Sequence, residues 1–402
     1  MLDIITLQNL SRECTNIKIN GNIFRQIKNI EIDLEFENYF YPYYQGKTGY
    51  CWLESTLQCV SLYTECKFGK KYFFDDKYLM FFDKLEKANL FFDNILRETD
   101  NSVADRHINY FLRNAMTDKG QWQMSVNLIQ KYGLVLKDKN EAKSVIKTSE
   151  LNMYISRLLK IAALKISQIC ARKKNTFAIE KIRKEIMQRI FNMLVAFYGN
   201  QYDTYLSEVI DGLTPLEFYN KNIAFPFDDY ISIYPTKDRQ MCEIEVLYDG
   251  NISELNRNKF LGVSNNQFDK LLNRQLQYDG FCWCSGDFGK FYIKQARALD
   301  DSCIWDDLNT LKNIKIDDIS RADAFEYGLA NMSHAFVVSP QKDSSDYFVY
   351  DSAYGLTEGK TCWISHSWFE KYLLQAIVKK EDIKNIESIK KIKEYPWNFF
   401  GI

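Results

Sequence analysis

The sequence lacks a strong excess of charge of either sign. In its 402 residues, 52 basic side chains balance 53 acidic ones, for a net charge of −1, so bulk charge favours neither a nucleic acid nor a membrane surface as a partner. It also lacks any apolar run of about twenty residues, the length that a membrane-spanning helix needs. The first residues show neither the basic nor the apolar region of a secretory signal. We therefore expect a cytoplasmic protein with no membrane partner.

Histidine is scarce, with 3 residues, whereas cysteine is frequent, with 10. In a long chain without a secretory signal, we expect reduced thiols rather than a disulfide framework. Cys282 and Cys284 are two residues apart with no histidine nearby, which is the wrong spacing for a zinc site and suits one face of a strand. We expect no metal or organic cofactor. A hydrophobic content of 46% allows a large core, and the length allows two or three domains.

A glycine-spaced loop over residues 43–50 leads into a helical pattern that begins at Cys51. Apolar residues recur at helical spacing as far as Leu62, which predicts a helix with one buried face. The first turn of a helix lowers the pKa of a thiol, because its unpaired N–H groups favour negative charge. Just upstream, the side-chain amide of Gln45 is placed to donate to an oxyanion beside the thiol. The alternative is that Cys51 is an ordinary buried cysteine.

Gln45 followed by Cys51 and Trp52 resembles the active-site signature of the papain-like cysteine peptidases. Later segments resemble the bleomycin hydrolases and bacterial aminopeptidase C, in matching order from about residue 40 to the last residues. The resemblance implies an α+β fold with a helical domain, a strand-rich barrel-like domain and a cleft between them. The expected boundaries are 1–40 for an N-terminal extension, 41–225 for the helical domain, 226–390 for the strand-rich domain and 391–402 for a C-terminal tail.

The few histidines leave three candidates for a base that serves Cys51. We expect His107 on the exposed side of a helix and His366 at the surface. His334 begins an apolar strand-like run, and a histidine in that setting is more often a core residue than a catalyst. Its surroundings resemble the Thr-His-Ala-Met segment of the family, which implies that His334 is the catalytic base.

Asp351 stands where the papain-like family has the asparagine that orients the base. A carboxylate there would stabilise the imidazolium and raise the pKa of His334. The tryptophan that shields this contact in the family is also replaced, by Ala353 or Tyr354. Two outcomes are open, a working triad with a shifted pH optimum or a weakened enzyme. We expect the working triad.

A glycine before a helical pattern, such as Gly120 before the pattern that starts at Trp122, is ordinarily a turn residue. The family reads Gly-Gly-Gln-Trp here, and its second glycine lines the cleft so that the substrate backbone can approach. Gly120 matches that glycine. Lys119 replaces the first one, which implies an altered rim of the substrate-binding cleft.

A basic helical region around residues 137–200 corresponds to a family-specific insertion. A basic helix is usually just a solvated face. The family, however, forms ring-shaped hexamers with a basic central channel and some nucleic-acid affinity. The resemblance therefore implies a homo-oligomer, a hexamer, with nucleic acid as a further candidate partner, and this region is where we expect the assembly surface.

In the family, the C-terminal tail enters the cleft and its carboxylate holds the free amine of the substrate. Here Trp397 and Gly401 match the tail, but the sequence stops at Ile402, two residues sooner. At about 3.3 Å per extended residue, the carboxylate would fall roughly 6 to 7 Å short. The alternative is a frayed apolar terminus.

Together these features predict a cytosolic cysteine aminopeptidase that hydrolyses peptide substrates through a thioester acyl-enzyme. Two alternatives remain open. One is an oligopeptide endopeptidase, because of the shortened tail, and the other is a weakened family member that serves as a ring-shaped binding protein.

Overall fold

The computed structural model describes residues 43, 45–98, 105–137, 147–172, 175–208, 210–238, 240–253, 255–288, 292–293, 298–299, 319–340, 347–352, 362–384 and 386–400. The predicted extension over residues 1–40 lies outside the described residues. So do Ala353, Tyr354, Gly401 and Ile402, and the expectations stated for them stay predictions.

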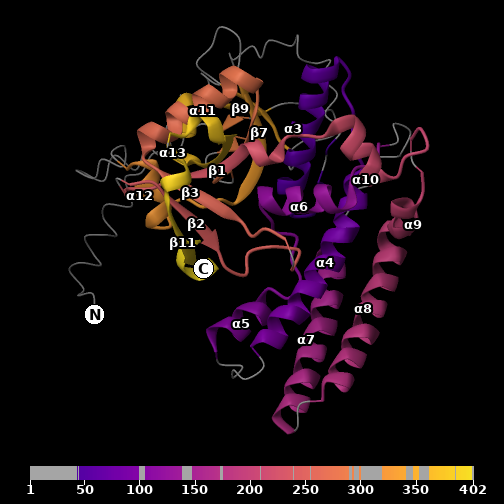
Figure 1. The fold of residues 1–402 in the computed structure, drawn as a ribbon. Helices are drawn as coiled ribbons and strands as arrows, with labels where there is room; N and C mark the ends of the chain where they lie inside the picture. Colours follow the sequence, from indigo (N-terminus) through magenta and orange to yellow (C-terminus); the bar gives the residue numbers. More distant parts are fainter. Residues whose placement is uncertain are drawn as a thin grey trace, which may run out of the picture.

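The first half of the described chain is helical (Figure 1). Among the described helices, none combines the length and the apolarity that crossing a bilayer requires. The helices are α3 (Cys51–Phe68), α4 (Asp76–Arg97), α5 (Arg106–Arg113), α6 (Trp122–Tyr132), α7 (Ser149–Arg172), α8 (Thr176–Tyr198), α9 (Gln201–Leu206) and α10 (Pro215–Phe218).

Helix α3 begins at Cys51, as predicted, and ends where Gly69 adopts a left-handed conformation with φ 65°. Glycine suits this position because it has no Cβ to clash. The prediction of a single buried face is wrong, since every residue from 52 to 62 is buried. The reason is that strands lie on one side of α3 and helices α4 and α6 on the other. Cys51 therefore starts a central helix rather than a surface one.

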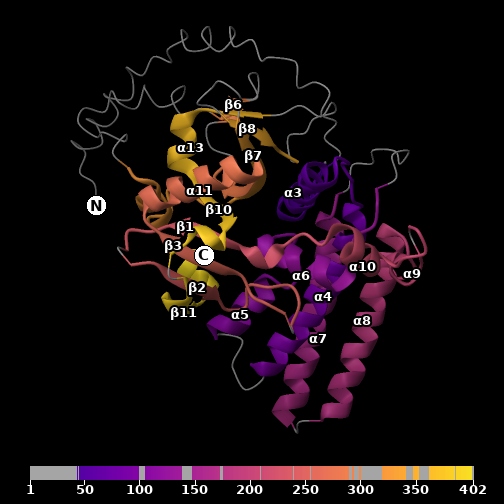
Figure 2. The same ribbon diagram turned by 45° about the horizontal axis from the view of Figure 1, so that its top comes forward.

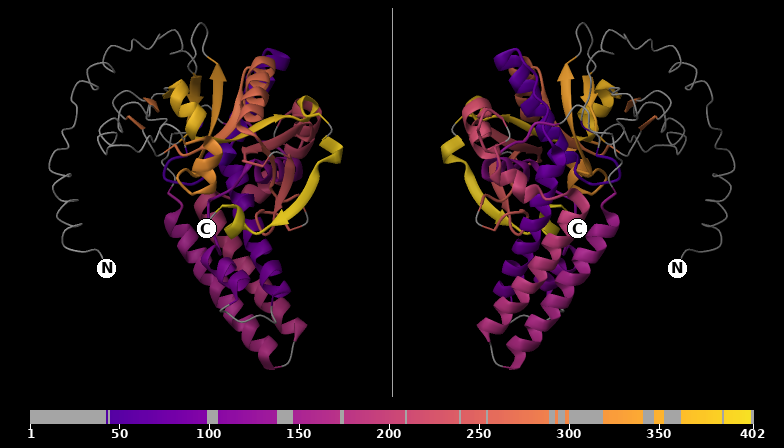
Figure 3. Two further views of the ribbon diagram at one scale, coloured as in Figure 1. Left: turned by 90° about the vertical axis from the view of Figure 1, so that its left-hand side faces the viewer. Right: turned by 90° about the vertical axis from the view of Figure 1, so that its right-hand side faces the viewer.

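The predicted basic helical region forms a hairpin of α7 and α8, which projects away from the rest of the molecule (Figure 3). Both helices pack on α4. An ion pair between Arg183 and Asp93, with an N–O distance of 2.8 Å, links α8 to α4. Each helix of the hairpin has a buried row of apolar residues, and other apolar residues of both helices are exposed.

The second half of the chain is rich in strands, which alternate with short helices. Its elements are β1 (Tyr230–Pro235), β2 (Cys242–Val246), β3 (Lys259–Val263), α11 (Asn265–Asp279), β4 (Cys282–Gly286), β5 (Tyr292–Ile293), β6 (Ala298–Leu299), α12 (Arg321–Glu326), β7 (His334–Pro340), β8 (Tyr347–Tyr350), β9 (Cys362–Ile364), α13 (His366–Tyr372), β10 (Leu373–Lys379), β11 (Lys390–Glu394) and α14 (Pro396–Phe399).

The described strands form one mixed sheet in the order β11-β2-β3-β1-β10-β4-β7-β8-β9-β6-β5. Strand β7 lies near its middle, antiparallel to both β4 and β8, and next to α3 (Figure 2). The helical half and this strand-rich half together form an α+β fold. The sheet brings the first residue of β7, His334, to the side of α3.

Side chains alternate between the two faces of the sheet, as the pleat of a strand requires. In β7, Ala335 and Val337 belong to the core shared with α3, whereas Phe336 lies in a second core with α11 and α13. Cys282 and Cys284 of β4 both lie in this second core, so the prediction that they share one face is confirmed.

The C-terminal segment packs between the two halves. Trp397 of α14 stacks on Tyr395, with ring centroids 4.7 Å apart, and Phe399 lies 4.7 Å from Phe260 of β3. His107 packs against the same segment, with its ring centroid 4.9 Å from that of Tyr395. The prediction that His107 is exposed is therefore wrong, because residues far along the chain cover it.

Candidate active site

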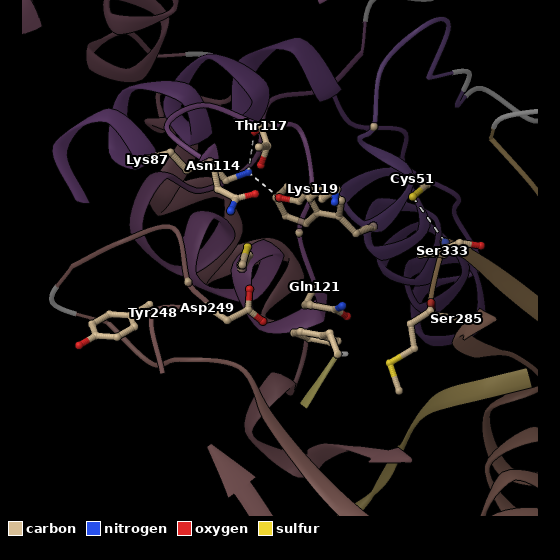
Figure 4. Close-up of a pocket in the computed structure, with 18 of the residues that line it drawn as sticks. Cys51, Lys87, Asn114, Thr117, Lys119, Gln121, Tyr248, Asp249, Ser285 and Ser333 are labelled. Carbon is tan, nitrogen blue, oxygen red and sulfur yellow. Dashed lines mark hydrogen bonds between the residues drawn. The ribbon is translucent and has the colours of Figure 1, made fainter. Parts of the chain in front are cut away.

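A cleft with a volume of about 820 Å³ lies between the two halves, and both contribute to its walls. The helical half supplies Cys51 and Gln121, and the strand-rich half supplies Ser285, Ser333 and Asp249 (Figure 4). Cys51 is partly buried at the point where α3 meets β7. The thiol is thus open to a molecule bound in the cleft.

The structure brings Cys51, His334 and Asp351 together. The backbone N–H of Ala335 donates to Cys51 Sγ over 3.4 Å, and the thiol interacts electrostatically with His334. On the other side of the imidazole ring, His334 Nε2 lies 2.6 Å from Asp351 Oδ1. Since Nε2 is engaged by the carboxylate, Nδ1 is the ring nitrogen left for the sulfur.

Electrostatic interactions in this group favour an ion pair. Burial by itself would lower the pKa of His334, but the negative charges of Cys51 and Asp351 outweigh it and raise that pKa to about 10. Burial would raise the pKa of the Cys51 thiol, but His334 and the Ala335 N–H lower it below its usual value. Both shifts favour a thiolate beside an imidazolium, the reactive form of a cysteine nucleophile.

Gln45 is held against the residue that follows Asp351. Ser352 Oγ donates to Gln45 Oε1 over 2.9 Å, and the Gln45 backbone N–H donates to the Ser352 carbonyl over 3.2 Å. Gln45 Nε2 donates one hydrogen to the Thr48 carbonyl over 3.0 Å. A side-chain amide carries two such hydrogens, so the other is available in the cleft beside Cys51.

Asp118 fixes the loop that carries Cys51, a role that the sequence analysis missed. Its carboxylate accepts the backbone N–H of Gly49 over 3.1 Å and forms a buried ion pair with Lys84 of α4. Thr148 and Asn152, at the start of α7, also donate to it. These contacts lower the pKa of Asp118 to about 2, although burial acts in the opposite direction.

The predicted substrate residues Gly120 and Lys119 both lie in the wall of the cleft. A Cβ at Gly120 would lie 2.3 Å from the ring of Trp52, so only glycine fits. The Trp52 indole N–H donates to the Asp118 carbonyl over 2.7 Å, and the Lys119 carbonyl accepts from Lys87 Nζ over 2.8 Å. Close packing on Trp52 is thus a second reason for the glycine.

The described residues offer no cluster of histidine, cysteine or carboxylate side chains that could hold a metal ion. Seven cysteines in the described part of the chain are free thiols, namely Cys51, Cys59, Cys66, Cys170, Cys242, Cys282 and Cys284.

A thiol at the start of a central helix, paired with a histidine that a buried carboxylate holds at the edge of a sheet, defines the class of papain-like cysteine peptidases. The crystal structure of PepW from Lactobacillus rhamnosis has the same fold. It superposes with a TM-score of 0.80 at 22% identity, covering 100% of this chain and 99% of that one.

Sequence comparison reaches the same class independently. The family model of the Peptidase C1-like family matches residues 10–399. An aminopeptidase C from Lactobacillus delbrueckii subsp. lactis is 27% identical over 383 residues, 89% of this chain and 85% of its own length. An aminopeptidase W from the same organism is 26% identical over 356 residues, 84% of this chain and 80% of its own. The chain therefore belongs to the Peptidase C1-like family, as a cysteine aminopeptidase of papain-like fold.

Proposed function

We propose that this protein removes N-terminal residues from peptides through a thioester acyl-enzyme. The observation that carries the proposal is the contact of Cys51, His334 and Asp351 at the wall of the cleft. The Cys51 thiolate attacks the peptide carbonyl carbon, and the C–N bond then breaks as His334 gives its proton to the leaving amine. Water, deprotonated by His334, attacks the thioester and releases the acyl product and the thiol.

Two donors are placed to stabilise the oxyanion of this reaction. One is the free hydrogen of Gln45 Nε2, whose amide is oriented by Ser352. The other is the backbone N–H of Cys51, which as the first residue of α3 has no acceptor within the helix. We assign Asp351 the role of holding the imidazole ring and favouring its charged form.

Gly120 and Lys119 are the proposed contacts for the substrate backbone and the cleft rim. Phe400 lines the same cleft, which supports the proposal that the tail ending at Ile402 restricts access to Cys51. We also propose residues 41–225 and 226–390 as the two domains.

The direct test uses Cys51→Ala and an amino-acid fluorogenic substrate. We expect kcat/KM to fall by about 10⁴-fold or more, as for other nucleophile deletions, and a thiol-directed peptidase inhibitor to stop labelling the protein. Cys66→Ala is the matched control, because Cys66 is an exposed thiol near the end of the same helix. Turnover that survives in Cys51→Ala would contradict the proposal, and absence of turnover in the unmodified protein would favour the scaffold alternative.

The endopeptidase alternative is tested by deleting Gly401 and Ile402 and by blocking the substrate's amine. If the tail restricts the cleft, N-acetylated peptides are poor substrates of the full chain and become good ones after the deletion. An unchanged preference for free N-termini after the deletion would remove the tail from the model.

We further propose a homo-oligomer, hexameric as the family resemblance implies, in a reducing compartment such as the cytoplasm. Free thiols in the described chain support the compartment. Apolar side chains exposed on the α7 and α8 hairpin support an assembly surface. They are Met153, Tyr154, Ile161, Leu164, Phe177 and Phe197. Light scattering of a Leu164→Lys variant, compared with the unmodified chain, tests the assembly.

A further inference from the structure

Asp249 is the only carboxylate among the described residues that line the active-site cleft. The charged side chains that share the lining are Lys87, Lys119 and His334, all potential cations. Figure 4 shows the Asp249 side chain in the cleft, on the opposite side of the view from Cys51. The cleft is lined by apolar residues, among them Leu90, Phe91 and Met124, and by uncharged polar residues, among them Asn94, Asn114 and Gln121.

The turn that carries Asp249 is held in a fixed conformation. Asn258 Nδ2 donates to Asp249 Oδ2 over 2.8 Å and to the Asp249 carbonyl over 3.2 Å. The preceding residue, Tyr248, has φ 61°, a left-handed conformation that costs a non-glycine residue free energy. Strain of this kind persists where the surrounding contacts enforce one geometry.

A buried carboxylate links this turn to the nucleophile loop. Asn251 Nδ2 donates to Asp83 Oδ1 over 3.1 Å and to the Met124 carbonyl over 3.0 Å. The hydroxyl of Tyr50, next to Cys51, donates to the other oxygen of Asp83 over 2.9 Å. The turn of Asp249 and the loop of Cys51 are therefore anchored on one side chain and keep a fixed separation.

The charge of Asp249 has no ion-pair partner among the described residues. Lys87 is engaged elsewhere, by Asp83 at 2.8 Å and by the Lys119 carbonyl at 2.8 Å. Burial raises the pKa of Asp249 to about 6, while Asn258, Lys87 and Arg257 act in the opposite direction. The Asp249 carboxylate therefore lies in the wall of the cleft with Asn258 as a hydrogen-bond donor and no ion pair among the described residues.

We propose that Asp249 binds the ammonium group of the substrate and thereby selects peptides with a free N-terminus. The proposal rests on the proposed peptidase function and specifies its substrate. An ammonium ion that enters the cleft loses water, and a carboxylate already fixed there compensates for that loss. The α-ammonium is the group that all unblocked peptides share, whereas a lysine side chain is the other source of the same ion.

The experiment compares Asp249→Asn with Glu98→Gln on lysine-free peptides with free or acetylated N-termini. Glu98 accepts the hydroxyl of Tyr248 over 3.1 Å, so it contacts the same turn, but it is not among the described lining residues of the cleft. We expect Asp249→Asn to raise KM for free peptides at least about tenfold, with a small change in kcat, and to abolish the preference over acetylated peptides. Glu98→Gln keeps the preference.

Asp249→Glu and a pH series separate recognition from folding. The glutamate variant should recover part of the preference, since it restores the charge. In the unmodified enzyme, KM for free peptides should rise as pH falls through about 6, where Asp249 becomes protonated, and this rise should be absent in Asp249→Asn.

Three results would overturn the proposal. An intact preference in Asp249→Asn removes the carboxylate from recognition. An equal loss on free and acetylated peptides that Asp249→Glu does not recover assigns Asp249 to the structure of the turn. A further set of acetylated peptides that contain lysine tests the other source of ammonium, and a loss of activity in Asp249→Asn that is confined to this set assigns the site to a lysine side chain. If the unmodified enzyme cleaves no peptide, the proposed function fails instead.

Discussion

The helical and the strand-rich sides of the active site each place a largely buried carboxylate near the reacting pair, and the two carboxylates have different partners. Asp118 is neutralised by Lys84 and accepts the Gly49 N–H, so its contacts fix the backbone of the nucleophile loop. Asp351 accepts from the His334 ring. One carboxylate therefore positions the loop that carries Cys51, and the other acts on the ionisation of His334.

Glu54, in the first turn of α3, makes the contrast clearer. Its side chain is fully buried, and neither carboxyl oxygen has a hydrogen-bond partner among the described residues. Burial and the nearby charge of Asp76 raise its pKa well above the usual value, although Lys137 opposes them. Burial alone therefore does not determine the pKa of a carboxyl group near Cys51. The pKa depends on whether hydrogen-bond donors and positive charges lie beside the group.

The largest effect is expected for Asp118→Asn, which removes the buried ion pair with Lys84 on the helical side of the active site. The change leaves Lys84 buried without its counter-charge, and we expect the free energy of unfolding to fall by about 3–5 kcal/mol. Urea denaturation measures it. The control is Asp93→Asn, which removes a partly exposed pair with Arg183 and should cost about 1 kcal/mol or less. Equal losses in the two variants would mean that Asp118 does not have the anchoring role.

The next largest effect is expected for Asp351→Asn, which changes ionisation on the strand-rich side. The carboxylate raises the pKa of His334 and also acts to raise that of Cys51. Without it both pKa values fall, so the acid and alkaline limbs of the kcat/KM profile should both move to lower pH. We expect activity to fall by no more than about 100-fold, the lower end of the range for one acid–base contribution, because an asparagine can still orient the ring.

Glu370→Gln is the control for that profile. Its carboxylate lies 3.2 Å from the exposed His366 and away from Cys51, so the profile should not change. A profile that stays in place in Asp351→Asn, or a complete loss of activity, would show that Asp351 does not have the assigned role.

The smallest effect is expected for Glu54→Gln, which should stabilise the protein. Because the folded state raises the pKa of Glu54, the stability that the group contributes is present at low pH and is lost as pH rises. The amide cannot ionise, so the gain in stability should grow as pH rises. Melting curves at pH 5 and pH 8 measure it.

Glu86→Gln is the matched control, since Glu86 is also buried but contacts Lys131 and Tyr132. That variant should lose stability. A Glu54→Gln protein less stable than the parent at both pH values would contradict the comparison.

The start of α3 at Cys51 and the strand that begins at His334 could be predicted because both follow from local patterns of apolar residues. The burial of α3 on all sides could not, since it depends on a sheet formed by residues more than 200 positions later. The partial burial of His107 could not be predicted for the same reason, because its aromatic neighbours come from the end of the chain. Asp249 lies in a turn whose local sequence gives no sign that it borders the cleft.

The sequence by itself, through its resemblance to the papain-like cysteine peptidases, predicted the family and indicated Cys51 and His334 as the candidate nucleophile and base. Only the tertiary structure decided the pKa of each carboxyl group and the residues with which it interacts. Asp118, Glu54 and Asp249 have the same functional group, and their pKa values differ because burial, counter-charges and hydrogen-bond donors come from distant parts of the chain.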